Sequence, residues 1–159
     1  MGLEIERKFL VKGNDYRNEA YKYYDMVQGY IAHENGRSVR IRITNTESLI
    51  TIKGPTDAKG MSRYEWNHTI DKRDAVELME LCQGSKIEKR RYLIHSGPHV
   101  FEIDEFHGES EGLVIAEVEL TSENEVFQKP DFIGDEVTGD KRYYNAHLTR
   151  DPYKNWKKE

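Results

Sequence analysis

Hydrophobic and polar residues alternate with a period of two along most of the chain. In the segment GLEIERKFLV, Glu4, Glu6 and Lys8 share one parity, and the other parity is mostly apolar. Because side chains along a β-strand point alternately to two faces, this period predicts strands. The pattern predicts eight of them, at 3–11, 24–34, 38–45, 48–54, 62–70, 87–95, 99–106 and 114–121.

Turn residues separate several of these strands, and one long segment has a helical pattern instead. ENGR at 34–37 contains Asn35-Gly36, a hairpin signal, and SGPH at 96–99 is a second turn. DKRDAVELMELCQG at 71–84 has apolar residues at helical spacing and Gly84 at its end, which predicts a helix. DEVTGDKRYYNAHL at 135–148 predicts a turn, a short helix and a closing apolar contact.

Eight strands joined mostly by short turns favour one compact arrangement. We expect a single domain over residues 1–159, of α+β class but mainly β: an eight-stranded antiparallel barrel with a few flanking helices. The interior of an eight-stranded barrel is just wide enough for side chains or for one small ligand.

Composition and charge exclude several classes of protein. A net charge of −5 and a pI near 5.7 argue against a nucleic-acid partner. No run of residues has the length and apolarity of a membrane span or a signal peptide, so no membrane partner is expected. Cys82 is the single cysteine, which excludes an intramolecular disulfide and fits a reducing compartment, so we expect a cytoplasmic protein.

The charged residues of seven predicted strands keep one parity within each strand. Seven are acidic and seven are basic: Glu4, Glu6, Glu65, Glu102, Asp104, Glu117 and Glu119, and Lys8, Arg40, Arg42, Lys53, Arg63, Lys89 and Arg91. One interpretation is a sheet with a solvated face and cross-strand ion pairs. The other is a set of charged faces that converge inside the barrel.

The second interpretation has a chemical consequence. Clustered carboxylates repel one another unless they hold cations, and clustered arginines and lysines need an anion. A polyphosphate with divalent metal ions satisfies both groups. Oxygen ligands without histidine or cysteine favour Mg²⁺ or Mn²⁺ over Zn²⁺.

The motifs themselves resemble those of a known family. Glu4-x-Glu6-x-Lys8 is similar to the ExExK signature of the CYTH superfamily, the triphosphate tunnel metalloenzymes. The resemblance continues in order through QGYI, VRIR, TIKG, RYEW, EKRRY, FEIDEF, AEVEL and GDEVTGDKRYYNAHL, which span nearly the whole chain. It is closest to the short, single-domain bacterial members.

The resemblance implies a barrel that encloses a charged tunnel, and it implies roles for individual residues. Lys8, Arg40, Arg42, Lys53 and Arg91 would bind phosphates, with Lys89 in place of Arg91 if the register in EKRRY differs. Glu4, Glu6, Asp104, Glu117 and Glu119 would hold two Mg²⁺ or Mn²⁺ ions. Glu65, Glu102 and Arg63 would support them. Tyr30 and Lys8 are the candidate catalytic residues, although Tyr30 also fits a barrel-wall aromatic.

The expected activity is metal-dependent hydrolysis of a triphosphate, with inorganic tripolyphosphate as the leading substrate. A class IV adenylate cyclase, a thiamine triphosphatase and a non-catalytic polyphosphate-binding module remain alternatives.

If the charged parity faces inward, apolar residues such as Ile5, Phe9, Ile41, Ile52 and Val118 face outward, with few helices to cover them. A large exposed apolar surface usually marks an interface, so we expect a homodimer.

Overall fold

The computed structural model describes residues 2–156, and strands make up most of it. The strands are β1 (Leu3–Val11), β2 (Lys22–Glu34), β3 (Arg37–Thr44), β4 (Ser48–Lys53), β5 (Ser62–Ile70), β6 (Gln83–Ser96), β7 (His99–His107), β8 (Val114–Glu119) and β9 (Ile133–Glu136). The α-helices are α1 (Tyr16–Glu19), α2 (Lys72–Met79) and α3 (Asn145–Leu148). Three short 3-10 helices are η1 (Gly108–Ser110), η2 (Lys141–Tyr143) and η3 (Tyr153–Asn155).

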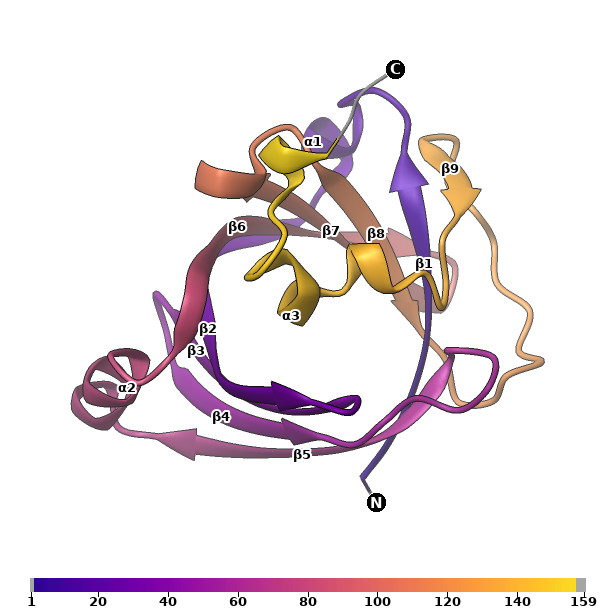
Figure 1. Cartoon of the computed structure of the whole chain (residues 1–159). Helices are drawn as coiled ribbons and strands as arrows, with labels where there is room; N and C mark the ends of the chain where they lie inside the picture. Colours follow the sequence, from indigo (N-terminus) through magenta and orange to yellow (C-terminus); the bar gives the residue numbers. More distant parts are fainter. Residues whose placement is uncertain (1, 157–159) are drawn as a thin grey trace.

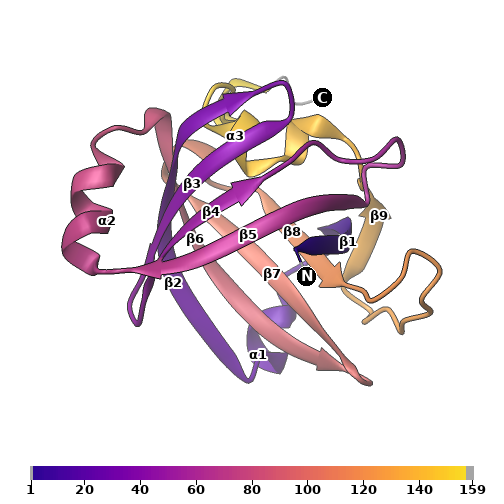
Figure 2. The ribbon, with the colours of Figure 1, turned by 90° about the horizontal axis from the view of Figure 1, so that it is seen from below.

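The sheet closes on itself, which confirms the predicted barrel. Its strand order is β5-β4-β3-β2-β6-β7-β8-β1-β9, every paired strand is antiparallel, and β1 also pairs with β5. The eight predicted strands form the barrel, and β9 is an additional strand beside β1 (Figure 1). Figure 2 shows α3 at one end of the barrel, α1 at the other and α2 against its side.

Three details differ from the predicted elements. The patterns did not predict α1 or β9, which are each four residues long. Helix α2 is shorter than the predicted helix 71–84, and Gly84 belongs to β6 rather than to a helix end. Gly84 has a φ of +71°, and a Cβ there would lie 2.5 Å from the Thr149 carbonyl oxygen. The close approach of the C-terminal segment therefore explains this glycine.

The apolar parity of the strands is mostly buried, and the expectation that it stays uncovered is wrong. Ile5, Phe9, Ile41 and Val118 are all buried. Tyr16 of α1, together with Phe132 and Ile133, completes one core cluster outside the barrel, and α2 packs against β2, β3 and β4. Ile52, by contrast, is 41% exposed. Short helices and loops thus supply cover that the strand pattern did not reveal.

A second core cluster lies within the barrel, at the end occupied by α3. Ile87, Phe106 and Ile115 have the inward parity of their strands, and they pack with Tyr143 and Leu148 from the C-terminal segment. The predicted short helix and its closing apolar contact are therefore present. This cluster fills one part of the interior with apolar side chains and leaves the rest to polar ones.

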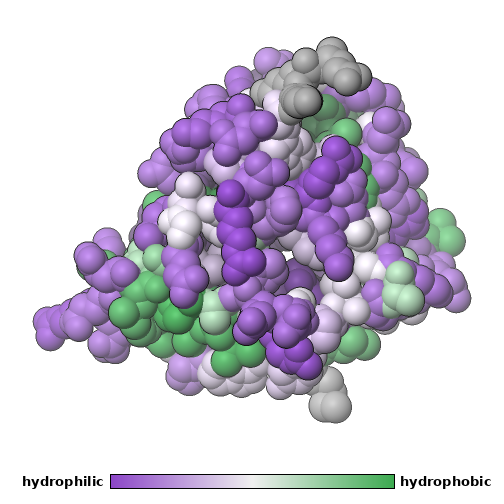
Figure 3. Space-filling view, viewed as in Figure 1, coloured by the Kyte–Doolittle hydropathy of each residue, from purple (hydrophilic) through white to green (hydrophobic). Residues whose placement is uncertain are grey.

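The surface seen down the barrel is mainly hydrophilic around its centre, and hydrophobic residues gather beside α2 (Figure 3). Among the described residues, no helix combines the length and apolarity needed to cross a membrane.

Candidate functional site

A polar cavity of about 680 Å³ occupies the remaining barrel interior. Fourteen of the fifteen predicted site residues line it, and each of the eight barrel strands contributes at least one of them. Strand β2 contributes Tyr30, β7 and β8 contribute only glutamates, and the other five strands contribute cations. The fourteen are Glu4, Glu6, Lys8, Tyr30, Arg40, Arg42, Lys53, Arg63, Glu65, Lys89, Arg91, Glu102, Glu117 and Glu119. The charged faces therefore converge inside the barrel instead of facing solvent.

The strand register places opposite charges side by side. Lys8 lies opposite Glu117, Glu4 opposite Arg63, and Lys53 opposite Glu65. Directly paired residues on one face of an antiparallel sheet lie close enough for their side chains to interact. The register of EKRRY is also settled, because Lys89 and Arg91 face inward, whereas Arg90 bonds Asp25 on the outer face.

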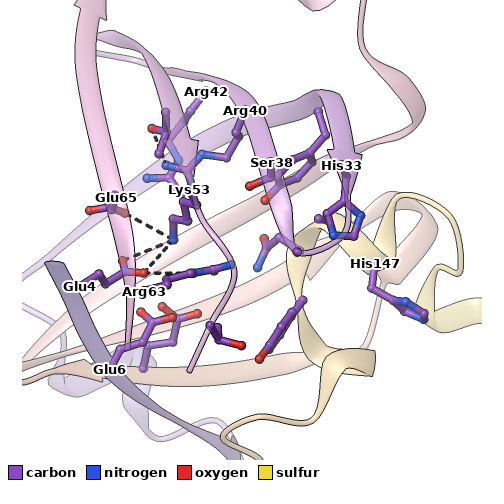
Figure 4. Close-up of a pocket in the computed structure, with 18 of the residues that line it drawn as sticks. Glu4, Glu6, His33, Ser38, Arg40, Arg42, Lys53, Arg63, Glu65 and His147 are labelled. Carbon is purple, nitrogen blue, oxygen red and sulfur yellow. Dashed lines mark hydrogen bonds and ion pairs between the residues drawn. The ribbon is translucent and has the colours of Figure 1, made fainter. Parts of the chain in front are cut away.

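Glu4 lies at the centre of one charged group, shown in Figure 4. The Lys53 ammonium lies 3.0 Å from the Glu4 carboxylate and 3.4 Å from that of Glu65, and the Arg63 Nε lies 3.6 Å from Glu4. Two cations thus share two carboxylates at this end of the cavity.

Burial and mutual repulsion disfavour the charged form of several carboxylates in this part of the cavity. Burial and the carboxylates of Glu117 and Glu4 raise the pKa of Glu6 well above its ordinary value. Burial, with nearby acidic groups, also raises the pKa of Glu4 and that of Glu119. Glu117 differs: although burial opposes it, attraction to Lys8, Arg91 and Lys89 lowers its pKa. Glu4, Glu6 and Glu119 therefore form a site where an added cation would relieve repulsion.

Asp104 is the one predicted residue that does not line the cavity. It is 2% exposed and lies beneath Lys89 and Arg91. Its Oδ1 accepts from Arg91 Nε at 2.7 Å, and its Oδ2 accepts from Lys89 Nζ at 2.7 Å and from Arg91 Nη2 at 2.9 Å. Burial would raise the pKa of Asp104, but these two cations outweigh it and lower that pKa. In this arrangement Asp104 supports cations instead of facing a ligand.

Unlike Lys89 and Arg91, Arg40 and Arg42 have no carboxylate within 4.0 Å among the described residues. The Arg40 Nη2 donates to Thr51 Oγ1 at 3.0 Å, and its Nε is buried without a partner among those residues. The Arg42 Nε donates to Gln28 Oε1 at 2.9 Å. Burial, then the charges of Arg40 and Arg91, lower the pKa of Arg42. This pair is a concentration of positive charge with neutral partners, which suits an anion.

The oxygen donors fit a hard divalent cation by type and by charge. Glu4, Glu6 and Glu119 offer carboxylates on two paired strands, and Glu6 lies directly opposite Glu119. Across residues 2–156, no three acidic, histidine or cysteine side chains already converge on one point. Glu4 is instead bonded to Lys53, so a metal ion would have to draw these carboxylates together.

Several polar residues in or beside the cavity were not predicted as site residues. Gln28 and Thr51 are fully buried among the charged residues, and Asn145 and Tyr144 reach the cavity from the C-terminal segment. Gln28 and Thr51 share the inward parity of their strands, so a search that included neutral polar residues would have found them. The alternating strand pattern has no signal for Asn145, because its segment is not a barrel strand; the residue appears only within the GDEVTGDKRYYNAHL motif.

Comparisons with known proteins give one consistent result. The sequence model described as the CYTH domain matches residues 2–147. A curated protein of Acetivibrio thermocellus named inorganic triphosphatase is 49% identical over 158 residues, 99% of each chain. A protein of Nitrosomonas europaea with the same name is 36% identical over 152 residues, covering 91% of this chain and 95% of that protein. A solved crystal structure of an inorganic triphosphatase has a TM-score of 0.65 at 33% identity, covering 92% of this chain and 97% of that one.

The repulsion at Glu6 yields a testable prediction about stability. We expect Glu6→Gln to stabilise the metal-free protein by about 1 kcal/mol, or roughly 2–4 °C in melting temperature, because an uncharged isostere replaces a mutually repelling carboxylate. At a pH between the ordinary pKa of a glutamate and the raised pKa of Glu6, the folded state holds a proton that the unfolded state has lost. The free energy of unfolding of the wild type therefore falls as pH rises through this range. The advantage of the variant therefore grows from about pH 5 upward.

Thermal melts with chelator at several pH values measure this difference. Glu105→Gln is a control of opposite sign: Glu105 accepts from Tyr16 and Arg17, and these partners outweigh burial to lower its pKa. A melting temperature for Glu6→Gln below that of the wild type at neutral pH would contradict the assignment.

Proposed function

The chain belongs to the CYTH domain family, and from that premise we propose that it is a divalent-metal-dependent hydrolase whose substrate is inorganic tripolyphosphate. The observation on which the proposal depends is the pair Arg40 and Arg42, which line the cavity without carboxylate partners in the described chain, together with carboxylates in the same cavity that repel one another. A polyphosphate and its metal ions supply both missing charges.

The substrate assignment follows from the charges and from the relatives. Six cations from β1, β3, β4 and β6 line the cavity: Lys8, Arg40, Arg42, Lys53, Lys89 and Arg91. A linear anion with several phosphate groups can contact cations on opposite walls at once, which a single phosphate cannot. Both curated relatives are named inorganic triphosphatases, which favours tripolyphosphate over a nucleoside triphosphate.

The family implies dependence on a divalent metal, and we assign its ligands to the carboxylates with raised pKa. Glu4, Glu6 and Glu119 would hold Mg²⁺ or Mn²⁺, with Glu117 beside them and Asp104 acting through Lys89 and Arg91. Two ions are expected from the number of carboxylates. When bound, such ions neutralise charge on the phosphate oxygens and lower the pKa of a bound water.

The residues of this chain then position the anion and stabilise the charge that develops on it. Arg40 and Arg42 would hold one part of the polyphosphate, and Lys8 would neutralise the oxygen that leaves. Tyr30 is buried, lines the cavity and lies opposite Arg40 in the β2–β3 pair. Its hydroxyl is our candidate for orienting the attacking water.

The central experiment is phosphate release from tripolyphosphate, pyrophosphate and ATP with Mg²⁺ or Mn²⁺. We expect metal-dependent hydrolysis of tripolyphosphate, and a loss of at least about 100-fold in the Glu4→Ala/Glu6→Ala double variant, because the charge stabilisation at the reacting phosphate is removed. A double variant of two exposed outer-face carboxylates, Asp25→Ala/Glu88→Ala, is the matched control and should retain activity.

Adding thiamine triphosphate as a substrate, resolving the ATP products by chromatography and measuring tripolyphosphate binding by calorimetry tests the alternative functions. Cyclic AMP and pyrophosphate from ATP would identify a cyclase, and turnover of thiamine triphosphate alone would identify a thiamine triphosphatase. Tight binding of tripolyphosphate without turnover would identify a binding module. Each of these results would contradict the proposed hydrolase.

Tyr30→Phe tests the proposed catalytic role of the hydroxyl. We expect kcat for tripolyphosphate to fall by about 10–100-fold with little change in KM, since the ring that packs in the wall is retained and only the water contact is lost. Steady-state kinetics measure both constants. Unchanged kcat would mean that Tyr30 is a wall residue.

We also propose a homodimer, a cytoplasmic location and a single domain over residues 1–159. The exposed apolar surface that supports the dimer is smaller than the sequence predicted, and it lies on the outer face of β1, β4 and β5. Register places Leu3 opposite Tyr64, and Ile52 opposite Trp66. These four residues form one apolar patch, 62%, 56%, 41% and 42% exposed respectively.

The proposed cytoplasmic location has a separate basis. A free Cys82 is consistent with a reducing compartment.

The apolar patch predicts a dimer that one charge can disrupt. We expect the wild type to sediment as a dimer at micromolar concentration and Trp66→Glu to sediment as a monomer, because a buried unpaired carboxylate destabilises an apolar interface. Leu81→Glu, which changes an exposed apolar residue beside α2, is the control and should leave the dimer intact. A monomeric wild type would contradict the proposal.

A further inference from the structure

The C-terminal segment reaches the cations of the cavity through three consecutive residues. Lys8 Nζ donates to the Tyr143 carbonyl at 3.4 Å. The ring of Tyr144 lies 5.1 Å from Lys8 Nζ and 5.6 Å from Arg63 Cζ. Asn145, the first residue of α3, accepts a hydrogen bond from Lys89 of β6. The segment that closes the barrel therefore also contacts the side chains that would bind the substrate.

Asn145 connects two of these cations through neutral amides. Its Oδ1 accepts from Lys89 Nζ at 2.8 Å and from Gln28 Nε2 at 2.8 Å. The Oε1 of Gln28 in turn accepts from Arg42 Nε at 2.9 Å. One orientation of the Gln28 amide satisfies both neighbours, so the chain of hydrogen bonds from Lys89 to Arg42 has a single consistent direction.

The neutrality of this connection matters for an anion site. Lys89 and Arg42 carry like charges in a buried place, and burial lowers the pKa of both. Lys89 already pairs with Asp104 at 2.7 Å, and Asp104 is shared with Arg91. A carboxylate at position 145 would orient Lys89 equally well but would add a second negative charge and cancel the charge that an anion needs. An amide orients each donor and leaves its charge available.

We propose that Asn145 and Gln28 are positioning residues, which hold Lys89 and Arg42 in the orientation that binds the substrate anion without adding negative charge beside them. The inference rests on the proposed function and adds a pair of residues that are not themselves charged. It predicts that substrate affinity depends on an amide outside the barrel strands.

The alternative is that Asn145 only anchors α3 to the barrel. That anchorage has other sources. Leu148 is fully buried in the inner core cluster, Ser85 N donates to the Thr149 carbonyl at 2.9 Å, and Arg150 Nη2 donates to the His33 carbonyl at 2.6 Å. A variant that loosens α3 without touching the amides can therefore separate the two roles.

The experiment compares Asn145→Leu with the control Leu148→Ala. Leu148→Ala removes apolar packing of α3 and leaves every hydrogen bond of Asn145 in place. Two quantities are measured for each: the Kd of tripolyphosphate for metal-free protein by calorimetry, and KM and kcat with metal. Thermal melts give the stability of each variant.

We expect Asn145→Leu to raise the Kd and the KM by about 10–100-fold, the range for one lost hydrogen bond to a charged group, with a smaller change in kcat. Leu148→Ala should lower the melting temperature by at least as much and leave the Kd within about twofold, because a cavity in the core affects folding alone. Gln28→Leu should raise the Kd as well, and the double variant should raise it by less than the product of the two single effects.

Equal effects of Asn145→Leu and Leu148→Ala on the Kd would overturn the inference and leave the proposed function standing. Absence of tripolyphosphate binding and hydrolysis in the wild type would instead overturn the proposed function itself. If Asn145→Leu does not fold, Gln28→Leu decides the question, since it cuts the same chain from β2, and an unchanged Kd there would overturn the inference.

Discussion

The structure depends on one electrostatic constraint, the burial of many charges inside a barrel that cannot pair them all. Arg40 and Arg42 have neutral hydrogen-bond partners, and Glu4, Glu6 and Glu119 have raised pKa values. Buried charges normally destabilise a protein unless they are paired. Here arginines with neutral partners and carboxylates that repel one another lie in the same cavity, so a guest that supplies both signs would stabilise the folded chain.

The rest of the fold makes this arrangement possible. Antiparallel register places inward charges opposite one another. Most of the outer apolar parity is buried under α1, α2, β9 and the loops, which supplies the stability that the interior cannot. The C-terminal segment closes one end with an apolar cluster around Leu148 and presents Asn145 to the cations. Folding energy and binding chemistry are therefore divided between the two faces of the same strands.

Sequence patterns predicted the barrel and most of the site because a period of two assigns a face to each residue. The family resemblance inferred from the ExExK signature and the motifs that follow it in order is confirmed by the match over residues 2–147. Parity places a residue inside the barrel but not at the cavity surface, so it could not tell that Asp104 lies beneath Lys89 and Arg91. It also missed the four-residue elements α1 and β9, which are too short to show a period, and Asn145, whose position depends on tertiary packing.

The most direct test of the account is a crystal structure of the protein with tripolyphosphate and Mn²⁺, with anomalous scattering used to locate the metal. The account predicts phosphate groups between the walls that carry Arg40, Arg42 and Lys53, and anomalous peaks within about 2.0–2.5 Å of carboxylate oxygens of Glu4, Glu6 or Glu119. An anion bound on the outer surface, or Mn²⁺ held away from these carboxylates, would contradict it.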